Sequence, residues 1–271
     1  MLYKLLKKLL IKQVAAKSPA ETIEESVGFH TFFFFISFHF LFIFQEGIFL
    51  GSPFILLNYK TYLQGTGYGA VEIAMACRAV SEESGIEIAV APQFPDIYRV
   101  ASEVELPVFS QHLDGVGAGS FTGHVFGKCI KEAGAVGTLI NHSERRLTLA
   151  EIEASLKAAK EFGLRAVICT NNVPTTAAAA ALGPDYVAIE PPELIGSGIP
   201  VSKADPEVVS GSVEAVAKIN PGVKVLCGAG ISKGEDLRAA LDLGSQGVLL
   251  ASGIVKAADP RAALEDLISL I

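Results

Sequence analysis

The feature of this sequence that most restricts its fold is an alternation of short apolar runs and longer segments of helical periodicity, which continues from residue 53 onward. The helical segments include "GAVEIAMACRAVSEESG" and "LTLAEIEASLKAAKEFG", in which apolar residues recur at the spacing of one helix face. We predict that the apolar runs are strands. There are eight of them, at residues 54–58, 86–92, 107–112, 136–142, 165–170, 185–190, 223–230 and 246–252.

The predicted strands are rich in Val, Ile, Leu and Ala along their whole length, which is typical of strands covered on both faces. Such strands, alternating with helices, form parallel sheets in proteins of the α/β class. Eight strand–helix units in roughly 220 residues fit a closed (β/α)8 barrel, which typically has about 250 residues. The chain is 50% hydrophobic, enough to bury the core of such a domain.

An open, doubly wound sheet is the main alternative fold. Its sequence mark is G-x-G-x-x-G directly after the first strand, with an acidic residue about 20 positions further on. The turn after residues 54–58 contains Asn58 and Lys60 instead, and the later "GVGAG" and "GAGISKG" stretches lack the spacing and position of a dinucleotide site. The closed barrel is therefore the prediction.

The first fifty residues differ from the rest in composition. We predict that residues 1–50 form an N-terminal extension outside a catalytic barrel domain at 51–271. The extension begins with a basic amphipathic stretch, "MLYKLLKKLLIK", and continues into an apolar run at 29–44, "FHTFFFFISFHFLFIF". One interpretation is translated upstream sequence ahead of a true start near Leu50, and a membrane anchor is the alternative.

The apolar run at 29–44 is shorter than the roughly 20 residues that a membrane-spanning helix needs, and His and Ser residues interrupt it. A cleaved signal peptide fits poorly, because three Glu residues separate the basic start from the apolar run. We therefore favour upstream sequence, and we expect a membrane to be a partner only if the extension is genuine. The chemistry of the barrel is the same in either case.

Charge and cysteine content exclude several classes of function. The net charge is −7 and no Lys/Arg-rich stripe follows the first dozen residues, so we expect no nucleic-acid partner. The four cysteines are widely spaced without a C-x-x-C pair, which predicts free, buried thiols in a reducing compartment. No His, Asp and Glu cluster has metal-ligand spacing, and we expect neither a metal nor an organic cofactor.

In a (β/α)8 barrel the carboxyl ends of all strands meet at one mouth, so polar residues at those ends are candidates for function. Asn58 and Lys60 follow the first predicted strand, His142 the fourth and Glu190 the sixth. The seventh and eighth strands end in small residues, Gly228-Ala229-Gly230 and Ala251-Ser252-Gly253. His112 also ends a strand, and we interpret it as a structural histidine.

This set of residue types suits proton transfer beside a carbonyl group. Glu190 would be the base. His142 precedes "SERRLTL", so we expect it at or just before a helix start, where the helix dipole favours a neutral imidazole that donates to a carbonyl oxygen. Lys60 would stabilise a developing enediolate and attract an anionic substrate, and Asn58 would add a donor. The glycine-rich ends of strands seven and eight would expose backbone N–H groups to a phosphate.

Five motifs, "NYK", "NHSERR", "AIEPPELIGSG", "LCGAGIS" and "GVLLASG", resemble those of the triosephosphate isomerases, in particular the compact archaeal form, over residues 53–271. The resemblance implies a cytoplasmic isomerase of glycolysis and gluconeogenesis that interconverts dihydroxyacetone phosphate and D-glyceraldehyde 3-phosphate through an enediolate. It also implies a small-molecule triose phosphate as substrate and a homo-oligomer, either a dimer or a tetramer.

Carried onto this sequence, the resemblance implies that Glu190 is the catalytic base, His142 the electrophile and Lys60 a catalytic and substrate-binding residue, beside Asn58. "PPELIGSG" would be a lid over the substrate, stiffened by prolines at one hinge and loosened by glycines at the other. Glu193, within the lid, is interpreted as a solvated residue. The remaining implied substrate contacts are Ile195 and Gly196 of the lid, and Gly230, Ala251 and Ser252 around the phosphate.

Two departures from the bacterial and eukaryotic pattern concern the phosphate. Gly230 stands where that form has a Ser, so a hydroxyl contact is absent or is supplied elsewhere, with Ser232 as one candidate. Ala251-Ser252 replaces a Gly-Gly pair, which keeps the N–H donors. Two other functions stay open from the sequence: another phosphate-binding barrel synthase, and a membrane-tethered scaffold that has kept the barrel.

Overall fold

The computed structural model describes residues 52–195 and 198–271. The predicted extension at 1–50 lies outside the described residues, as does Gly196 of the predicted lid. The chain divides into two compact units, Met1–Ile48 and Phe49–Ile271, and the fold below is that of the second. The boundary between extension and barrel domain stays a prediction.

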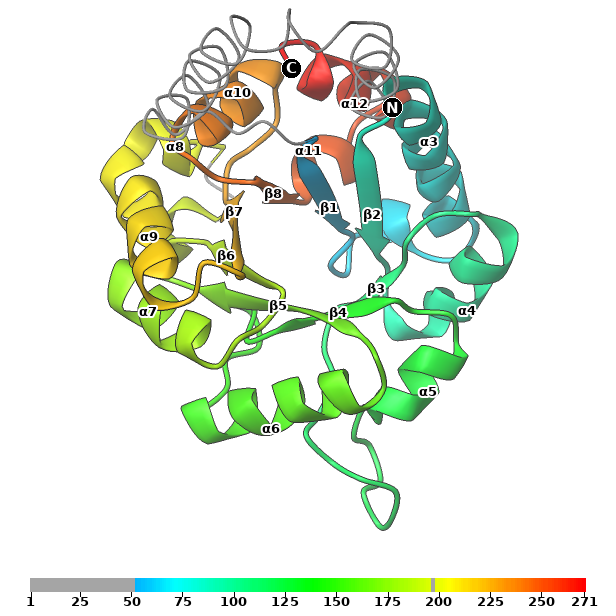
Figure 1. Cartoon of the computed structure of the whole chain (residues 1–271). Coiled ribbons are helices and arrows are strands. Elements are labelled where there is room, and N and C mark those ends of the chain that lie inside the picture. Colours follow the sequence, from blue (N-terminus) through cyan, green and yellow to red (C-terminus); the bar gives the residue numbers. More distant parts are fainter. Residues whose placement is uncertain (1–51, 196–197) are drawn as a thin grey trace, which may run out of the picture. The chain divides into compact units, whose positions relative to one another are not determined.

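Within the described residues the chain forms eight parallel strands arranged as a barrel, with helices around them (Figure 1). The hydrogen-bonded order is β2-β1-β8-β7-β6-β5-β4-β3, and a single parallel bridge between Val90 and Val108 connects its two ends. The predicted (β/α)8 barrel is confirmed. The strands are β1 (Phe54–Asn58), β2 (Glu87–Ala91), β3 (Phe109–Ser110), β4 (Gly137–Ile140), β5 (Arg165–Thr170), β6 (Tyr186–Ile189), β7 (Lys224–Gly228) and β8 (Gly247–Leu250).

The helices follow the strands in alternation, as the periodicity predicts. The segment "LTLAEIEASLKAAKEFG" forms α6, whose start is fixed by a capping box in which Thr148 accepts from the Glu151 N–H and Glu151 accepts from the Thr148 N–H. The longer helices are α3 (Tyr68–Ser84), α4 (Phe94–Glu103), α5 (Gly127–Glu132), α6 (Leu149–Glu161), α7 (Val173–Ala181), α9 (Pro206–Ile219), α10 (Gly234–Asp242) and α12 (Pro260–Ile268).

Four short elements lie in the loops and matter for the site. They are the 3-10 turns η1 (Leu63–Gly65) and η2 (Pro192–Leu194), and the one-turn helices α8 (Val201–Ala204) and α11 (Ser252–Val255). None of the helices in the described part of the chain is both long and apolar enough to span a bilayer.

The barrel interior is a packed core in which alternate strand residues form one cluster and the others face the helices. Aromatic rings fill its amino-terminal end: Phe54 packs on Tyr186 at 5.0 Å and on Phe109 at 5.9 Å between ring centroids. The Arg165 guanidinium lies over Phe54 and Phe109 and is paired to Glu87 at 2.7 Å. With this end filled, function has to be sought at the opposite mouth.

All four cysteines are free, as predicted. Cys77, Cys169 and Cys227 are buried, and burial raises the pKa of Cys77 and of Cys227 to about 12, so these thiols stay neutral. The prediction of buried thiols is wrong for Cys129, which is exposed. The reason is that α5 is only six residues long, and it turns Gly127 and Ile130 rather than Cys129 toward the barrel.

Candidate functional site

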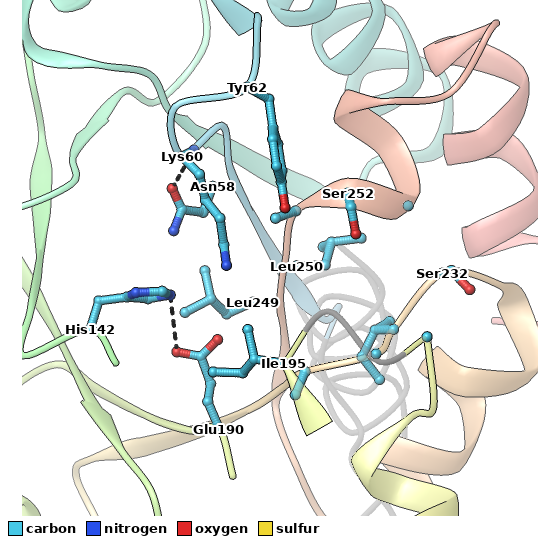
Figure 2. A pocket seen from close by; sticks show the side chains of 16 residues that line it. Asn58, Lys60, Tyr62, His142, Glu190, Ile195, Ser232, Leu249, Leu250 and Ser252 are labelled. Atoms are coloured by element: carbon cyan, nitrogen blue, oxygen red, sulfur yellow. Dashed lines mark hydrogen bonds and ion pairs between the residues drawn. The ribbon is translucent and has the colours of Figure 1, made fainter. Parts of the chain in front are cut away.

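A cavity of about 170 Å³ opens at the carboxyl ends of the strands, and Figure 2 shows the side chains that line it. The structure brings together there every predicted site residue that it describes. These are Asn58, Lys60, His142, Glu190, Ile195, Gly230, Ala251 and Ser252. Gly196, the remaining predicted contact, lies outside the described residues.

Asn58, the last residue of β1, holds the backbone of Lys60. Its side-chain Oδ1 accepts the Lys60 N–H at 2.9 Å (Figure 2), and Lys60 has a left-handed φ of 49°. Gln111 donates from Nε2 to the carbonyls of Lys60 and Ala91, both at 2.9 Å. Since the Asn58 oxygen is occupied, its amide N–H groups are what it can offer to a ligand.

Lys60 is fixed at its charged end as well. Its Nζ pairs with Oε1 of Glu144 at 2.9 Å, and the lysine side chain is only 12% exposed whereas that of Glu144 is 58% exposed. Glu144 and Gln111 were both missed from the sequence. Glu144 stands two positions after His142 in "NHSERR", and Gln111 stands next to His112 in "SQHLD"; these polar strand-end motifs are the signal that could have drawn attention to them.

The expectation that His142 lies at a helix start is wrong. Helix α6 begins only at Leu149, and His142 instead opens a turn in which its carbonyl accepts the Arg145 N–H at 2.7 Å. The intervening loop is closed by Asn141, whose Oδ1 accepts the Leu147 N–H at 2.8 Å and whose φ is 63°. The Asn141 side chain thus holds a loop at the place where the sequence predicts the first turn of a helix.

A local contact, rather than a helix dipole, sets the proton on His142. The Glu144 backbone N–H donates to Nδ1 at 3.3 Å, so Nδ1 is the acceptor and Nε2 carries the proton in the neutral ring. That Nε2–H points into the cavity. A neutral ring in this tautomer would donate from Nε2, as the sequence suggested, but through a backbone contact and not a helix dipole.

Glu190 follows β6 directly, and its backbone N–H donates to the Thr170 carbonyl at 2.8 Å. Its Oε2 lies 3.7 Å from His142 Nε2 (Figure 2), too far for a hydrogen bond. Both side chains are nearly fully buried, and neither of these two atoms has a hydrogen-bond partner among the described residues. Buried polar atoms without partners are rare, and two that face one cavity indicate that a ligand supplies the missing partner.

The neighbours of Glu190 fix the place of its carboxylate. A β-carbon on Gly228 would lie inside van der Waals contact of Glu190 Cγ and 2.9 Å from Cδ, so only glycine fits at this point of β7. On the other side is Cys169, whose thiol pKa is raised well above its usual value by burial first and by the charge of Glu190 second. This thiol is therefore no nucleophile.

The loops after β7 and β8 lie against each other, and the β7 loop lies against Ile199, just after the predicted lid. A β-carbon on Gly253 would lie 2.9 Å from Ser232 Cβ, and one on Gly230 would collide with the carbonyl of Ile199. Gly230 also has a left-handed φ of 72°. Backbone N–H groups can therefore approach a ligand closely here.

Ser232 lines the cavity, but its hydroxyl is directed elsewhere. Its backbone N–H and its Oγ both approach Oδ2 of Asp236, at 3.1 and 3.4 Å. A cavity-lining residue that the sequence did not suggest is Tyr62, which follows Lys60 by two positions. An aromatic residue in a loop, two positions after Lys60, was the sequence signal that could have identified Tyr62.

Two residues fall outside the cavity, as expected. His112 is buried, but its Nε2 contacts Asp114 Oδ1 at 3.0 Å, which satisfies it within the fold. Glu193 is exposed on η2. Within the same lid Ile195 reaches the cavity, and Gly198 has a φ of 74°, which suits a hinge.

A closed parallel barrel with a carboxylate, an imidazole and an ammonium group gathered at its mouth defines the class of (β/α)8 enzymes that move protons by acid–base catalysis. A sequence model of the family described as triosephosphate isomerase matches residues 53–271. The chain belongs to the triosephosphate isomerase family and is an isomerase, which confirms the resemblance.

Among known relatives, the triosephosphate isomerase of Methanosarcina acetivorans is 95% identical over 222 residues, which are 82% of this chain and 100% of the relative. That of Methanosarcina barkeri is 91% identical over the same shares. That of Methanococcoides burtonii is 80% identical over 220 residues, 81% of this chain and 100% of the relative. The resemblance to the archaeal form is thereby confirmed.

Proposed function

We propose that this barrel interconverts dihydroxyacetone phosphate and D-glyceraldehyde 3-phosphate by moving a proton between neighbouring carbons through an enediolate. The observation that carries the proposal is the buried pair Glu190 and His142. Their facing atoms are 3.7 Å apart and have no other partner among the described residues. A reacting carbon and its oxygen placed beside this pair, in the cavity that both atoms face, would supply each with a partner.

Glu190 is the base in this proposal. Its carboxylate removes a proton from the carbon beside the substrate carbonyl and returns it to the neighbouring carbon, so one group serves both halves of the reaction. The short Glu side chain needs exact placement relative to the carbon. The backbone hydrogen bond to Thr170 and the close approach of Gly228 support that placement.

His142 and Lys60 stabilise the negative charge that develops on the substrate oxygen. The Nε2–H of neutral His142 donates to that oxygen, a device for which this enzyme family is a known example. The Lys60 ammonium adds a fixed positive charge in a partly buried site, where it acts more strongly than in water. The amide N–H groups of Asn58 contribute a further donor.

The phosphate binds at the loops after β7 and β8 in this proposal, held by backbone N–H groups around Gly230, Ala251 and Ser252. The lid, with Ile195 and Gly196, closes over the substrate and excludes water, which protects the enediolate phosphate from losing its phosphate group. Lid closure of this kind is established for the family. The contact of Gly230 with Ile199 supports a link between phosphate loop and lid.

The wider assignment follows from the family. We expect the enzyme to serve glycolysis and gluconeogenesis in the cytoplasm, to take a triose phosphate as its partner, and to assemble into a homo-oligomer, a dimer or a tetramer. No metal or organic cofactor is required in this scheme, because Glu190, His142 and Lys60 supply each step of the proton transfer.

The substitution Glu190→Asp tests the proposal. It keeps the charge and withdraws the carboxylate by about one bond length, so we expect kcat to fall by about 100-fold or more while the fold is kept. Isomerisation of D-glyceraldehyde 3-phosphate is measured by a coupled assay, and deuterium uptake from solvent by NMR. Glu193→Asp, on the exposed face of the lid, is the matched control and should leave kcat unchanged. Equal turnover of both variants would remove Glu190 from its role.

A further inference from the structure

Tyr62 is a polar residue of the cavity to which the proposed mechanism gives no task. It lines the same cavity as Lys60, Gly230 and Ser252. Figure 2 shows its ring extending along the wall between the Asn58–Lys60 turn and Ser252, with the hydroxyl near Leu250. This hydroxyl makes no hydrogen bond to any group within residues 52–195 and 198–271. It is therefore a free donor inside the site.

The backbone of Tyr62 is fixed before any ligand binds. Its N–H donates to the Tyr59 carbonyl at 3.2 Å, and its own carbonyl accepts from the Gly65 N–H at 3.0 Å and from the Thr66 hydroxyl at 3.1 Å. Tyr59 is itself fully buried, with its hydroxyl bonded to the Ala70 carbonyl. The ring of Tyr62 thus projects from a rigid turn.

The ring is also held from its other side. The Lys256 ammonium lies 4.2 Å from the Tyr62 ring centroid, close enough for a cation–π contact. Lys256 caps the carboxyl end of α11, the short helix that begins with Ser252. The contact therefore fixes the tyrosine against the element that follows one of the two proposed phosphate loops.

The phosphate end of the cavity has few side-chain donors among its described lining residues. Gly230 has no side chain, and the Ser232 hydroxyl is directed to Asp236. The hydroxyls of Tyr62 and Ser252 are the ones that remain among the described lining residues. An anionic ligand bound by backbone N–H groups of these loops would have the Tyr62 hydroxyl at the same end of the cavity.

We infer that the Tyr62 hydroxyl donates a hydrogen bond to a phosphate oxygen of the substrate and so determines specificity for phosphorylated trioses. It supplies from the β1 loop the side-chain contact that Gly230 does not supply from the β7 loop. The inference rests on the proposed function. Because this contact holds the phosphate in ground state and transition state alike, it acts on KM and not on kcat.

Tyr62→Phe tests this, since it keeps the ring and its contact with Lys256 and removes only the hydroxyl. Loss of one hydrogen bond to a charged group should raise KM for D-glyceraldehyde 3-phosphate about tenfold and weaken inorganic phosphate, as a competitive inhibitor and in calorimetry, by the same factor. Slow isomerisation of unphosphorylated D-glyceraldehyde should not change. Tyr68→Phe is the matched control, because that ring also lies against a cation, Arg99, but is exposed and outside the cavity.

Three outcomes would overturn the inference: an unchanged phosphate affinity in Tyr62→Phe, an equal loss in Tyr68→Phe, or a fall in D-glyceraldehyde turnover that matches the loss with the phosphorylated substrate. The last would place the hydroxyl at the reacting carbons. A wild-type protein that binds phosphate but does not isomerise the triose phosphate would refute the proposed function alone. Calorimetry with inorganic phosphate would still decide the role of Tyr62.

Discussion

Two histidines are buried near the barrel mouth, and they differ in whether the ring atom Nε2 has a hydrogen-bond partner. Nε2 of His112 has Asp114 at 3.0 Å, whereas Nε2 of His142 has no hydrogen-bond partner among the described residues. Burial lowers the pKa of His112, against a smaller opposing effect of the bond to Asp114, so its ring is neutral and internally satisfied. An unsatisfied buried donor is costly, and its presence next to Glu190 supports the proposed catalytic role of this pair.

The first prediction at the residue scale concerns Gly228, which lies against the Glu190 side chain. Any side chain there would displace Glu190, so we expect Gly228→Ala to lower kcat by about 100-fold, the cost of a misplacement of about 1 Å. Activity and thermal unfolding are measured together. Gly117→Ala is the matched control, because a β-carbon at Gly117 meets nothing within 4 Å. A Gly228→Ala enzyme with wild-type kcat would show that the carboxylate tolerates movement.

At the scale of elements, the segment that follows the predicted lid is joined to the loop after β7 by side chains as well as by backbone. Helix α8 follows the lid, and its Lys203 pairs with Oδ1 of Asp236 at 2.9 Å. Asp236 is buried at the start of α10 and also accepts the N–H groups of Ser232 and Lys233, both at 3.1 Å. One carboxylate thus connects α8, the β7 loop and α10.

The charge of Asp236 gives this junction a pH dependence. Burial raises the pKa of Asp236, but Lys203 and the two backbone N–H groups lower it more, so the net direction is downward. A carboxylate with a lowered pKa in the folded state stabilises the fold above its unfolded pKa of about 3.9, and this stability is lost as the pH falls below that value.

We therefore expect Asp236→Asn to be less stable than the wild type at pH 7, and the difference in Tm to shrink below about pH 4. Differential scanning calorimetry from pH 7 to pH 3 measures it. Asp242→Asn is the control at the exposed end of the same helix and should show no such convergence. A Tm difference that stays constant down to pH 3 would mean that the charge of Asp236 is not the source of its effect.

The elements themselves were largely predictable, because the apolar runs and helical periods are local properties of the sequence. Where prediction failed, single hydrogen-bonding groups decided the outcome, and only some of their partners lie close by in the sequence. β3 shrank to two residues after Pro107, which has no N–H for a ladder. Asn141 closed a loop where a helix start was expected, and Gln111 reached back to the Lys60 carbonyl across the barrel mouth. Such contacts depend on tertiary geometry, which motif spacing does not contain.

At the scale of the whole barrel, the two ends are built differently. Aromatic rings and the Arg165–Glu87 pair fill the amino-terminal end. Within the described residues the three non-glycine residues with left-handed φ all lie at the opposite mouth: Lys60, Asn141 and Ala229, after β1, β4 and β7. Backbone strain of this kind costs of order 1–3 kcal/mol per residue and is kept where function requires it. Stability and chemistry are thus assigned to opposite ends of the strands.

The last prediction at this scale concerns the predicted boundary between the extension at 1–50 and the barrel domain. The match to the archaeal relatives covers their whole length, and all the predicted site residues fall at or after Asn58. We therefore predict that a chain beginning at Gly51 folds alone and isomerises triose phosphate with a kcat within about twofold of the full chain, because it keeps every residue of the proposed catalytic site. Steady-state assays and calorimetry on both chains, purified side by side, measure this.

Loss of activity or of cooperative unfolding in the shorter chain alone would show that residues 1–50 belong to the working enzyme. Amino-terminal sequencing of the native protein, with membrane and supernatant fractions assayed separately, then decides between an anchor and translated upstream sequence.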